Sequence, residues 1–221
     1  MNKVFKRILR PLPRLLRWYL SKKRLFRYQD LSILVLPGVF HPGLFHSTTL
    51  LLRFIELQPL TNATLLEIGG GTGILSFVAA KLGALVVCTD ISQKAIVNMQ
   101  LNMQRNSIPI TIIHSDLFEG IDEKKFDWII LNPPYYPRKP THEEDFAWYC
   151  GEEHEYFIKF FSGVQPYISR ETRIIMVLSE VCDLAKIFKI ATDHGFAMIK
   201  FVEKSVWVDN KNYLFQIKQI G

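Results

Sequence analysis

Short apolar runs rich in β-branched residues alternate with apolar positions at helical spacing along most of the chain. Four runs between residues 64 and 131 predict strands, at 64–68, 84–89, 110–114 and 126–131. Apolar residues that recur every three or four positions predict helices between them, at 73–82 and 92–106. Alternation of this kind is typical of a parallel sheet covered by helices on both faces.

The pattern also extends in both directions from this region. An apolar stretch at 31–36 and a Pro- and Gly-rich loop at 37–43 precede a predicted helix at 47–58. Further elements follow in the second half: helix 152–169, strand 173–178 and helix 181–194, which ends at Gly195. Strands at 196–208 and 213–219 come last. The residues between them, 209–212, are too few for a crossover helix, so these two strands must be antiparallel.

Size and charge divide the chain into two parts. Its 221 residues, 48% of them apolar, suit one catalytic domain. Residues 1–29 hold ten Lys or Arg and no acid, and since the net charge of the whole chain is +6, residues 30–221 sum to 6 − 10 = −4. We therefore expect a basic N-terminal arm, 1–30, followed by a catalytic domain, 31–221.

The arm has apolar residues at near-helical spacing with basic residues between them, which predicts an amphipathic helix that Pro11 and Pro13 kink or divide. Three roles stay open for residues 1–29: contact with an anionic membrane surface, contact with nucleic-acid phosphate, and docking on the catalytic domain. The longest apolar run, 31–40, is too short to span a bilayer. We expect a cytoplasmic location, with peripheral membrane contact only through the arm.

The three cysteines bear on metal binding and on nucleophilic catalysis. Cys88, Cys150 and Cys182 lie far apart and form none of the close pairs that metal and redox motifs use. They indicate a reducing compartment and no metal. Cys150 has no neighbouring basic group in the sequence that would lower its pKa, so we expect no catalytic thiol.

A glycine-rich turn follows the strand at 64–68. It reads Glu67-Ile-Gly69-Gly-Gly71-Thr-Gly73 and opens the next helix, which is where nucleotide-like ligands bind in open α/β sheets. Asp90 ends the next strand, 19 residues after Gly71, and places a carboxylate beside a ribose. A dinucleotide motif fits poorly, because its final glycine would be Ile74 or Ser76 here.

The form Glu-x-Gly-x-Gly-x-Gly instead resembles motif I of class I S-adenosylmethionine-dependent methyltransferases, which have a Rossmann-like fold. The resemblance implies a mostly parallel seven-stranded sheet with an antiparallel final strand. It also implies that the glycine loop with Glu67 lines the methionine moiety, that Asp90 with Ile91 binds the ribose, and that Asp116 with Leu117 contacts the adenine. From the residues alone, Asp116 is equally suited to cap the following turn.

A second motif, Asn132-Pro133-Pro134-Tyr135, follows the strand at 126–131 and so lies at the same sheet edge. An amine conjugated to a ring or carbonyl is a poor nucleophile. The Asn132 side-chain oxygen and the Pro133 carbonyl can accept its two N–H bonds and hold the nitrogen toward the cofactor methyl. Pro133 and Pro134 stiffen the loop, and Tyr135 offers a ring on which a flat substrate stacks. Asn132 also belongs to the expected cofactor site.

Together the two motifs make the chain resemble the NPPY-type amino methyltransferases, which include release-factor glutamine and adenine-N6 methyltransferases. The resemblance extends from about residue 36 to the C-terminus and implies that 41–48 closes over the cofactor. We expect the loop 138–151 to be a lid over the substrate, although Phe146 and Trp148 are equally suited to pack under the next helix.

The acceptor stays open between several molecules that bear a planar NH₂. We favour a protein glutamine amide. The alternative is adenine N6 of RNA or DNA. The basic arm favours this acceptor, whereas the net negative charge of residues 30–221 disfavours it. A small-molecule amine and a non-catalytic cofactor-binding module are further alternatives, the last disfavoured because a binding module has no use for Asn132 and Tyr135.

Overall fold

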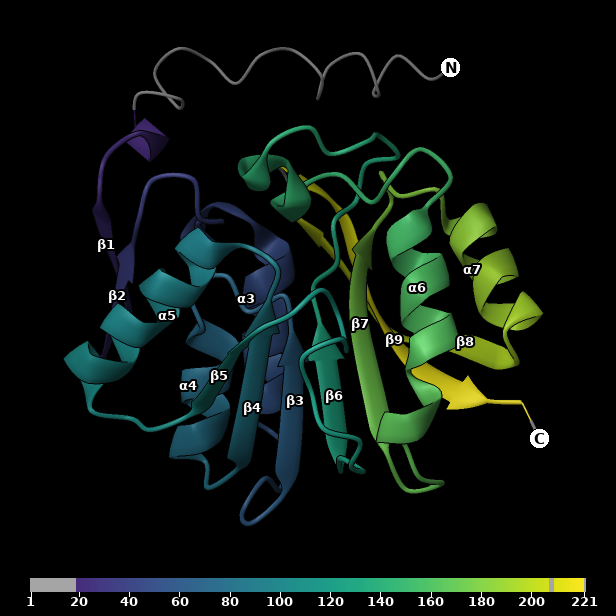
Figure 1. The fold of residues 1–221 in the computed structure, drawn as a ribbon, viewed down its shortest axis with the longest axis horizontal. Coiled ribbons are helices and arrows are strands. Elements are labelled where there is room, and N and C mark those ends of the chain that lie inside the picture. Colours follow the sequence, from purple (N-terminus) through teal and green to yellow (C-terminus); the bar gives the residue numbers. More distant parts are fainter. Residues whose placement is uncertain (1–18, 207–208, 221) are drawn as a thin grey trace.

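Seven strands form one sheet in the order β5-β4-β3-β6-β7-β9-β8 (Figure 1). The computed structural model describes residues 19–206 and 209–220. The strands are β3 (Thr64–Ile68), β4 (Leu85–Asp90), β5 (Thr111–His114), β6 (Trp128–Leu131), β7 (Arg173–Ser179), β8 (Phe196–Val206) and β9 (Asp209–Gln219). Strands β3 to β7 pair in parallel, and β9 pairs antiparallel with both β7 and β8. The predicted α/β fold with an antiparallel final strand is confirmed.

Helices cover both faces of the sheet. They are α3 (His46–Ile55), α4 (Ile74–Lys81), α5 (Gln93–Asn106), α6 (Glu155–Gly163) and α7 (Leu184–Asp193). The central strand β6 is buried throughout: Trp128 and Ile130 pack into the core beneath α3 and α4, while Ile129 and Leu131 pack into the core beneath α6 and α7. Burial on both faces explains why this strand is a continuous apolar run without alternation.

Two predicted boundaries were wrong. The helix expected over 152–169 ends as α6 at Gly163, and a 3₁₀ turn, Gln165–Tyr167, follows, because Pro166 lacks the N–H that would continue an α-helix. The connection expected at 209–212 is part of β9, since Asn212 pairs with Ser179 on one side and with Lys204 on the other. Its polar composition suggests a turn, but pairing with two neighbouring strands keeps it extended.

A two-stranded hairpin precedes α3. Strand β1 (Arg24–Tyr28) pairs antiparallel with β2 (Leu31–Val35), so residues 24–28, which sequence analysis assigned to the basic arm, form a strand. The predicted amphipathic helix falls mainly on 1–18, outside the described residues. Within the part of the chain that is described, no helix combines the length and apolar character needed to cross a membrane.

Three asparagines on one face of α5 hold the outer edge of β2: Asn98, Asn102 and Asn106. Asn102 is fully buried and is the centre of this row. Its Oδ1 accepts a hydrogen bond from Leu34 N (2.7 Å), and its Nδ2 donates to Leu34 O (2.9 Å) and to Thr72 O in the glycine loop (3.0 Å). The flanking asparagines bond in the same way to Leu36 N, Leu34 O and both backbone groups of Ser32. The helix thus replaces a third strand of the small sheet.

Replacing Asn102 should test how much this row stabilises the fold. In Asn102→Ala three hydrogen bonds are lost and buried backbone groups lose a partner, so we expect a loss of roughly 2–4 kcal/mol in the free energy of unfolding by urea. Gln104 is exposed on the same helix, and Gln104→Ala should change the value by less than about 0.5 kcal/mol. Equal stabilities of the two variants would contradict this account.

Candidate active site

A cavity of about 680 Å³ lies at the carboxyl ends of the parallel strands, and it brings the two sequence motifs together. The predicted site residues on its wall are Glu67, Gly69, Gly71, Asp90, Ile91, Asp116, Leu117, Asn132, Pro133, Pro134 and Tyr135. Gly73 does not line it. That residue has φ 80° and is the N-cap of α4, with Phe77 so close that a Cβ would lie 2.9 Å from its ring.

The half-buried carboxylate of Asp90 joins the glycine loop to the next loop. Its Oδ2 accepts a hydrogen bond from Gly71 N and its Oδ1 accepts one from Ser92 N, both at 2.8 Å. Gly71 has φ 56°, which L residues with side chains rarely adopt, so the loop needs a glycine there to aim its N–H at Asp90. Burial raises the pKa of Asp90, whereas the two N–H donors oppose that shift.

Glu67 is buried, and its carboxylate is directed toward α4. Oε2 accepts hydrogen bonds from Ser76 N (2.9 Å) and from the Ser76 hydroxyl. Burial raises the pKa of Glu67 to about 7. The residue therefore joins β3 to the first turns of α4, in addition to lining the cavity.

The raised pKa gives Glu67 a measurable effect on stability. The folded pKa of about 7 exceeds the ordinary 4.5. The protonated group therefore makes its full contribution to the free energy of unfolding below pH 4.5, and this contribution is lost as the pH rises toward 7. Glu67→Gln stays neutral throughout. The unfolding free energy of the wild type relative to that variant should fall by roughly 2–3 kcal/mol over this interval in urea denaturation. If the unfolding free energies of the two proteins follow parallel pH profiles, folding does not raise the pKa of Glu67.

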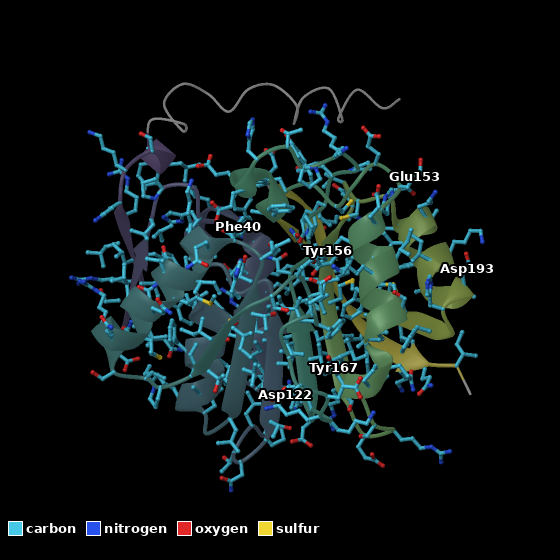
Figure 2. The ribbon with its side chains drawn as sticks, viewed as in Figure 1. Phe40, Asp122, Glu153, Tyr156, Tyr167 and Asp193 are labelled. Carbon is cyan, nitrogen blue, oxygen red and sulfur yellow. The ribbon has the colours of Figure 1, made fainter. Side chains whose placement is uncertain are left out.

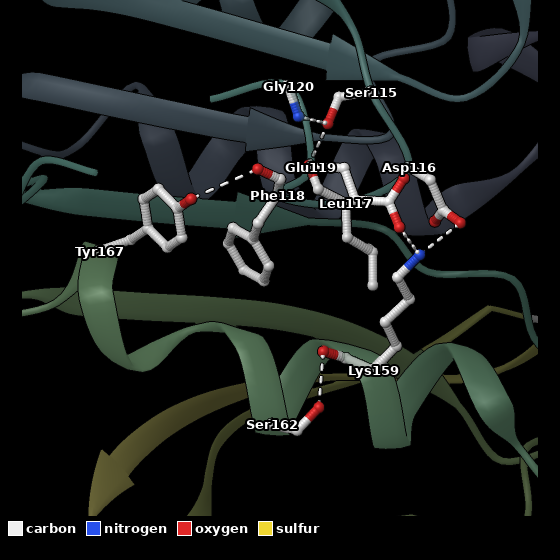
Figure 3. Close-up of polar contacts among 9 residues, drawn as sticks. All are labelled: Ser115, Asp116, Leu117, Phe118, Glu119, Gly120, Lys159, Ser162 and Tyr167. Atoms are coloured by element: carbon white, nitrogen blue, oxygen red, sulfur yellow. Dashed lines mark hydrogen bonds and ion pairs between the residues drawn. The ribbon is translucent and has the colours of Figure 1, made fainter. Parts of the chain in front are cut away.

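Asp116 is fixed by a helix on the far side of its loop. Lys159 of α6 donates to Asp116 Oδ2 and to Glu119 Oε1, both at 2.6 Å (Figure 3). The turn itself is braced by Ser115, whose Oγ accepts from Gly120 N (3.0 Å) and donates to Leu117 O (2.9 Å). The bracing considered for Asp116 thus belongs to Ser115, which leaves Asp116 directed at the cavity and at Lys159.

Asn132 is held on both sides of its amide group. Its Nδ2 donates to Ser47 Oγ at the start of α3 (3.3 Å), and its Oδ1 accepts from the Tyr135 hydroxyl (3.0 Å). The sequence predicts a stacking ring at Tyr135, and no local pattern marks Ser47. A hydroxyl on one lone pair of Oδ1 leaves the second lone pair for another donor. The amide plane of Asn132 is therefore oriented before any substrate arrives.

Two loops meet over the cavity through aromatic side chains. The ring centroids of Phe40 and Phe45 lie 4.7 Å apart, and the Trp148 ring lies 5.4 Å and 5.2 Å from them. Trp148 thus packs across the cavity and not under α6, while Phe146 is 38% exposed and lines the wall. Figure 2 shows Phe40 and Tyr156 near the ends of the strands where this cavity lies.

The loop 138–151 is also attached to the first turn of α5. Glu143 Oε1 accepts hydrogen bonds from Ser92 Oγ (2.8 Å) and Lys94 N (3.0 Å), and the Lys94 ammonium pairs with Glu144 at 2.8 Å. The Lys94 N–H and the Ser92 hydroxyl hold the pKa of Glu143 below its ordinary value. Because Ser92 N also bonds to Asp90, the loop is fastened directly beside the predicted ribose site.

The three cysteines, Cys88, Cys150 and Cys182, are free and buried. Burial raises the pKa of Cys150 to about 12, so its thiol stays protonated at neutral pH. The described residues contain no group of three His, Cys, Asp or Glu placed to hold a metal ion.

Comparison with known proteins identifies the family of this chain. The family model of the methyltransferase small domain matches residues 30–148, which is more than half of the chain. The chain belongs to this family. The methyltransferase motifs Glu67–Gly73 and Asn132–Tyr135 both lie inside the matched region.

Relatives of this methyltransferase differ in their acceptors. This chain is 33% identical over 147 residues to a putative protein N5-glutamine methyltransferase of Methanocaldococcus jannaschii, and the match covers 64% of this chain and 72% of that one. It is 26% identical over 190 residues to a ribosomal protein L11 methyltransferase of Thermotoga petrophila, covering 84% of this chain and 64% of that one. The fold is shared with the T. thermophilus 16S rRNA N2 G1207 methyltransferase in complex with AdoMet and guanosine, with TM-score 0.62, 21% identity and coverage of 95% of this chain and 52% of that one.

The cavity of this S-adenosylmethionine-dependent methyltransferase suits its cofactor. Three carboxylates, those of Glu67, Asp90 and Glu143, lie on the wall around the glycine loop. Carboxylates accept hydrogen bonds from ribose hydroxyls and attract an ammonium or sulfonium group, whereas they repel phosphate. A cofactor with hydroxyl and cationic groups and without phosphate therefore fits this wall better than a dinucleotide.

The attachment of the loop 138–151 should control how fast the cofactor leaves. Glu143→Ala removes both bonds to the start of α5, so we expect S-adenosylhomocysteine to dissociate roughly 5–10 times faster in stopped-flow displacement. Glu123→Ala, an exposed glutamate outside the cavity, is the control and should leave the rate unchanged. Equal rates for the two variants would show that Glu143 does not restrain the loop.

Proposed function

We propose that this methyltransferase methylates the nitrogen of a planar amino group, and that the acceptor is the side-chain amide of a protein glutamine. The observation that carries the proposal is the position of Asn132. Its amide is fixed between Ser47 and Tyr135 at the edge of the cavity that also holds the glycine loop. A fixed acceptor oxygen beside the methyl donor is what an NH₂ group of low nucleophilicity requires.

The chemistry then needs positioning and no covalent intermediate with the protein. When bound, S-adenosylmethionine supplies a methyl group made electrophilic by its sulfonium. Asn132 Oδ1 and the Pro133 carbonyl accept the two N–H bonds and turn the nitrogen lone pair toward that methyl. Tyr135 orients Asn132 through its hydroxyl and presents its ring to the flat amide. The methylated amide loses its extra proton readily to water, so a dedicated base is not needed.

We assign the cofactor residues along the wall of the cavity. The loop from Gly69 to Gly71 approaches the methionine moiety. Asp90 with Ile91 takes the ribose, and Asp116 with Leu117 takes the adenine. Lys159 holds Asp116 through an ion pair at 2.6 Å and so fixes the carboxylate that accepts from the adenine amino group.

Two observations favour glutamine over a nucleic-acid base. The archaeal relative at 33% identity is a putative glutamine methyltransferase. Residues 30–221 carry a net charge of −4, which opposes binding of a polyanion over the catalytic domain. The L11 and 16S rRNA enzymes among the relatives define the other outcomes of a substrate test, a different protein nitrogen or an RNA base.

Substitution of Asn132 tests the clamp. Asn132→Ala should lower kcat by roughly 10³ while the affinity for S-adenosylmethionine in isothermal titration stays within about threefold. Tyr135→Phe keeps the ring and removes the hydroxyl, so a smaller loss in kcat of roughly tenfold is expected. Turnover retained in Asn132→Ala would refute the clamp, and tight binding of NAD in place of S-adenosylmethionine would refute the cofactor assignment.

A further inference from the structure

A second recess opens beside the active-site cavity on the side of α3. It has a volume of about 200 Å³ and is lined by His46, Thr49, Leu50, Arg53, Lys204 and Asn212. Two of these residues, His46 and Asn212, also line the main cavity. The two spaces therefore adjoin one another.

The recess lies beside residues that adjoin the amine clamp. His46 precedes Ser47, whose hydroxyl bonds to Asn132. Asn212 pairs in register with Ser179, a residue of the main cavity at the end of β7. The glycine loop, Asp90 and Asp116 follow β3, β4 and β5, strands on the other side of β6 from β7. A group bound in the recess would thus belong to the methyl acceptor.

The recess carries positive charge from Arg53 and Lys204, and no described carboxylate pairs with either residue. Seven described lysines pair with carboxylates: Lys81, Lys94, Lys159, Lys186, Lys189, Lys200 and Lys211. Arg53 and Lys204 have no such partner among the described side chains.

Acids close to these two in sequence already have other partners. Glu56 accepts from Tyr28 and Gln29, and Glu203 pairs with Lys200 and Lys211. Two cations thus converge on one recess that the described part of the chain leaves without an anion.

We propose that this recess binds an acidic side chain of the protein substrate, close in sequence to the methylated glutamine; the inference rests on the function proposed above. A carboxylate matches two converging cations, and Thr49 can donate its hydroxyl to it. The space is small, which suits one carboxylate, and the net charge of −4 on residues 30–221 opposes a chain of phosphates. Arg53 and Lys204 then select the substrate, while Asn132 holds the reacting nitrogen.

The first test uses the mapped methylation site. Wild-type protein labels a cell extract with tritiated S-adenosylmethionine, the labelled glutamine is located by mass spectrometry, and peptides of that sequence carry serine in place of each nearby acid. Replacing one acid within about four residues of the glutamine should lower kcat/KM roughly tenfold for the wild type and less than twofold for Arg53→Met/Lys204→Met. Lys218→Met, an exposed lysine outside both cavities, is the control and should behave as the wild type.

Other results of the same experiment overturn the proposal. A methylated glutamine without a nearby acid would do so, as would an equal loss for the wild type and the double variant. Label in RNA would overturn it together with the glutamine assignment, and phosphate would then be the candidate anion for the recess.

A second test does not depend on methyl transfer, so it separates failure of the recess from failure of the proposed function. Sodium acetate is titrated into the protein and the Arg53 Nε–Hε resonance is followed, with sodium chloride at equal ionic strength as reference. A saturable shift that disappears in Lys204→Met supports an anion site. A response no different from that to chloride overturns the site even if a glutamine is methylated.

Discussion

The buried amide of Asn102 joins three parts of the molecule on which the site depends. It bonds to both backbone groups of Leu34 in β2 and to Thr72 O in the glycine loop, and it belongs to α5. The segment that begins where β2 ends carries Phe40 over the cavity and leads to Ser47. One side chain thus fixes the glycine loop relative to the segment that covers it, and with its two neighbours on α5 it replaces a missing strand.

The same coupling continues along the wall of the cavity. Asp90 joins the glycine loop to Ser92, Ser92 joins Glu143 of the covering loop, and Trp148 of that loop packs on Phe40. The cavity wall is therefore assembled from loops that hold each other, and Asn132 is oriented at its edge. The proposed methyl transfer to a weak nucleophile depends on such positioning, because the proposed reaction uses no acidic or nucleophilic side chain.

Much of the fold and the two motifs could be predicted from local patterns. Strands β3, β4 and β6 and the residues that follow them are runs whose period and turn residues are visible in the sequence. Contacts between distant segments were missed: Lys159 with Asp116, Glu143 with the start of α5, and Ser47 with Asn132. The asparagines at 98, 102 and 106 did offer a signal. Asparagine is unfavourable inside helices, so three at spacing four indicate a partner for that face.

The hydrogen bond from the Tyr135 hydroxyl to Asn132 could not be predicted because it depends on the conformation of the two prolines between them. The connection expected at 209–212 was wrong because polar residues in β9 resemble a turn.

The proposed reaction transfers the methyl group to a glutamine amide nitrogen held by Asn132. Its most direct test is acid hydrolysis of extract protein labelled with tritiated S-adenosylmethionine. The account predicts release of the label as volatile methylamine, absent with Asn132→Ala; label that stays on lysine or in RNA would contradict it.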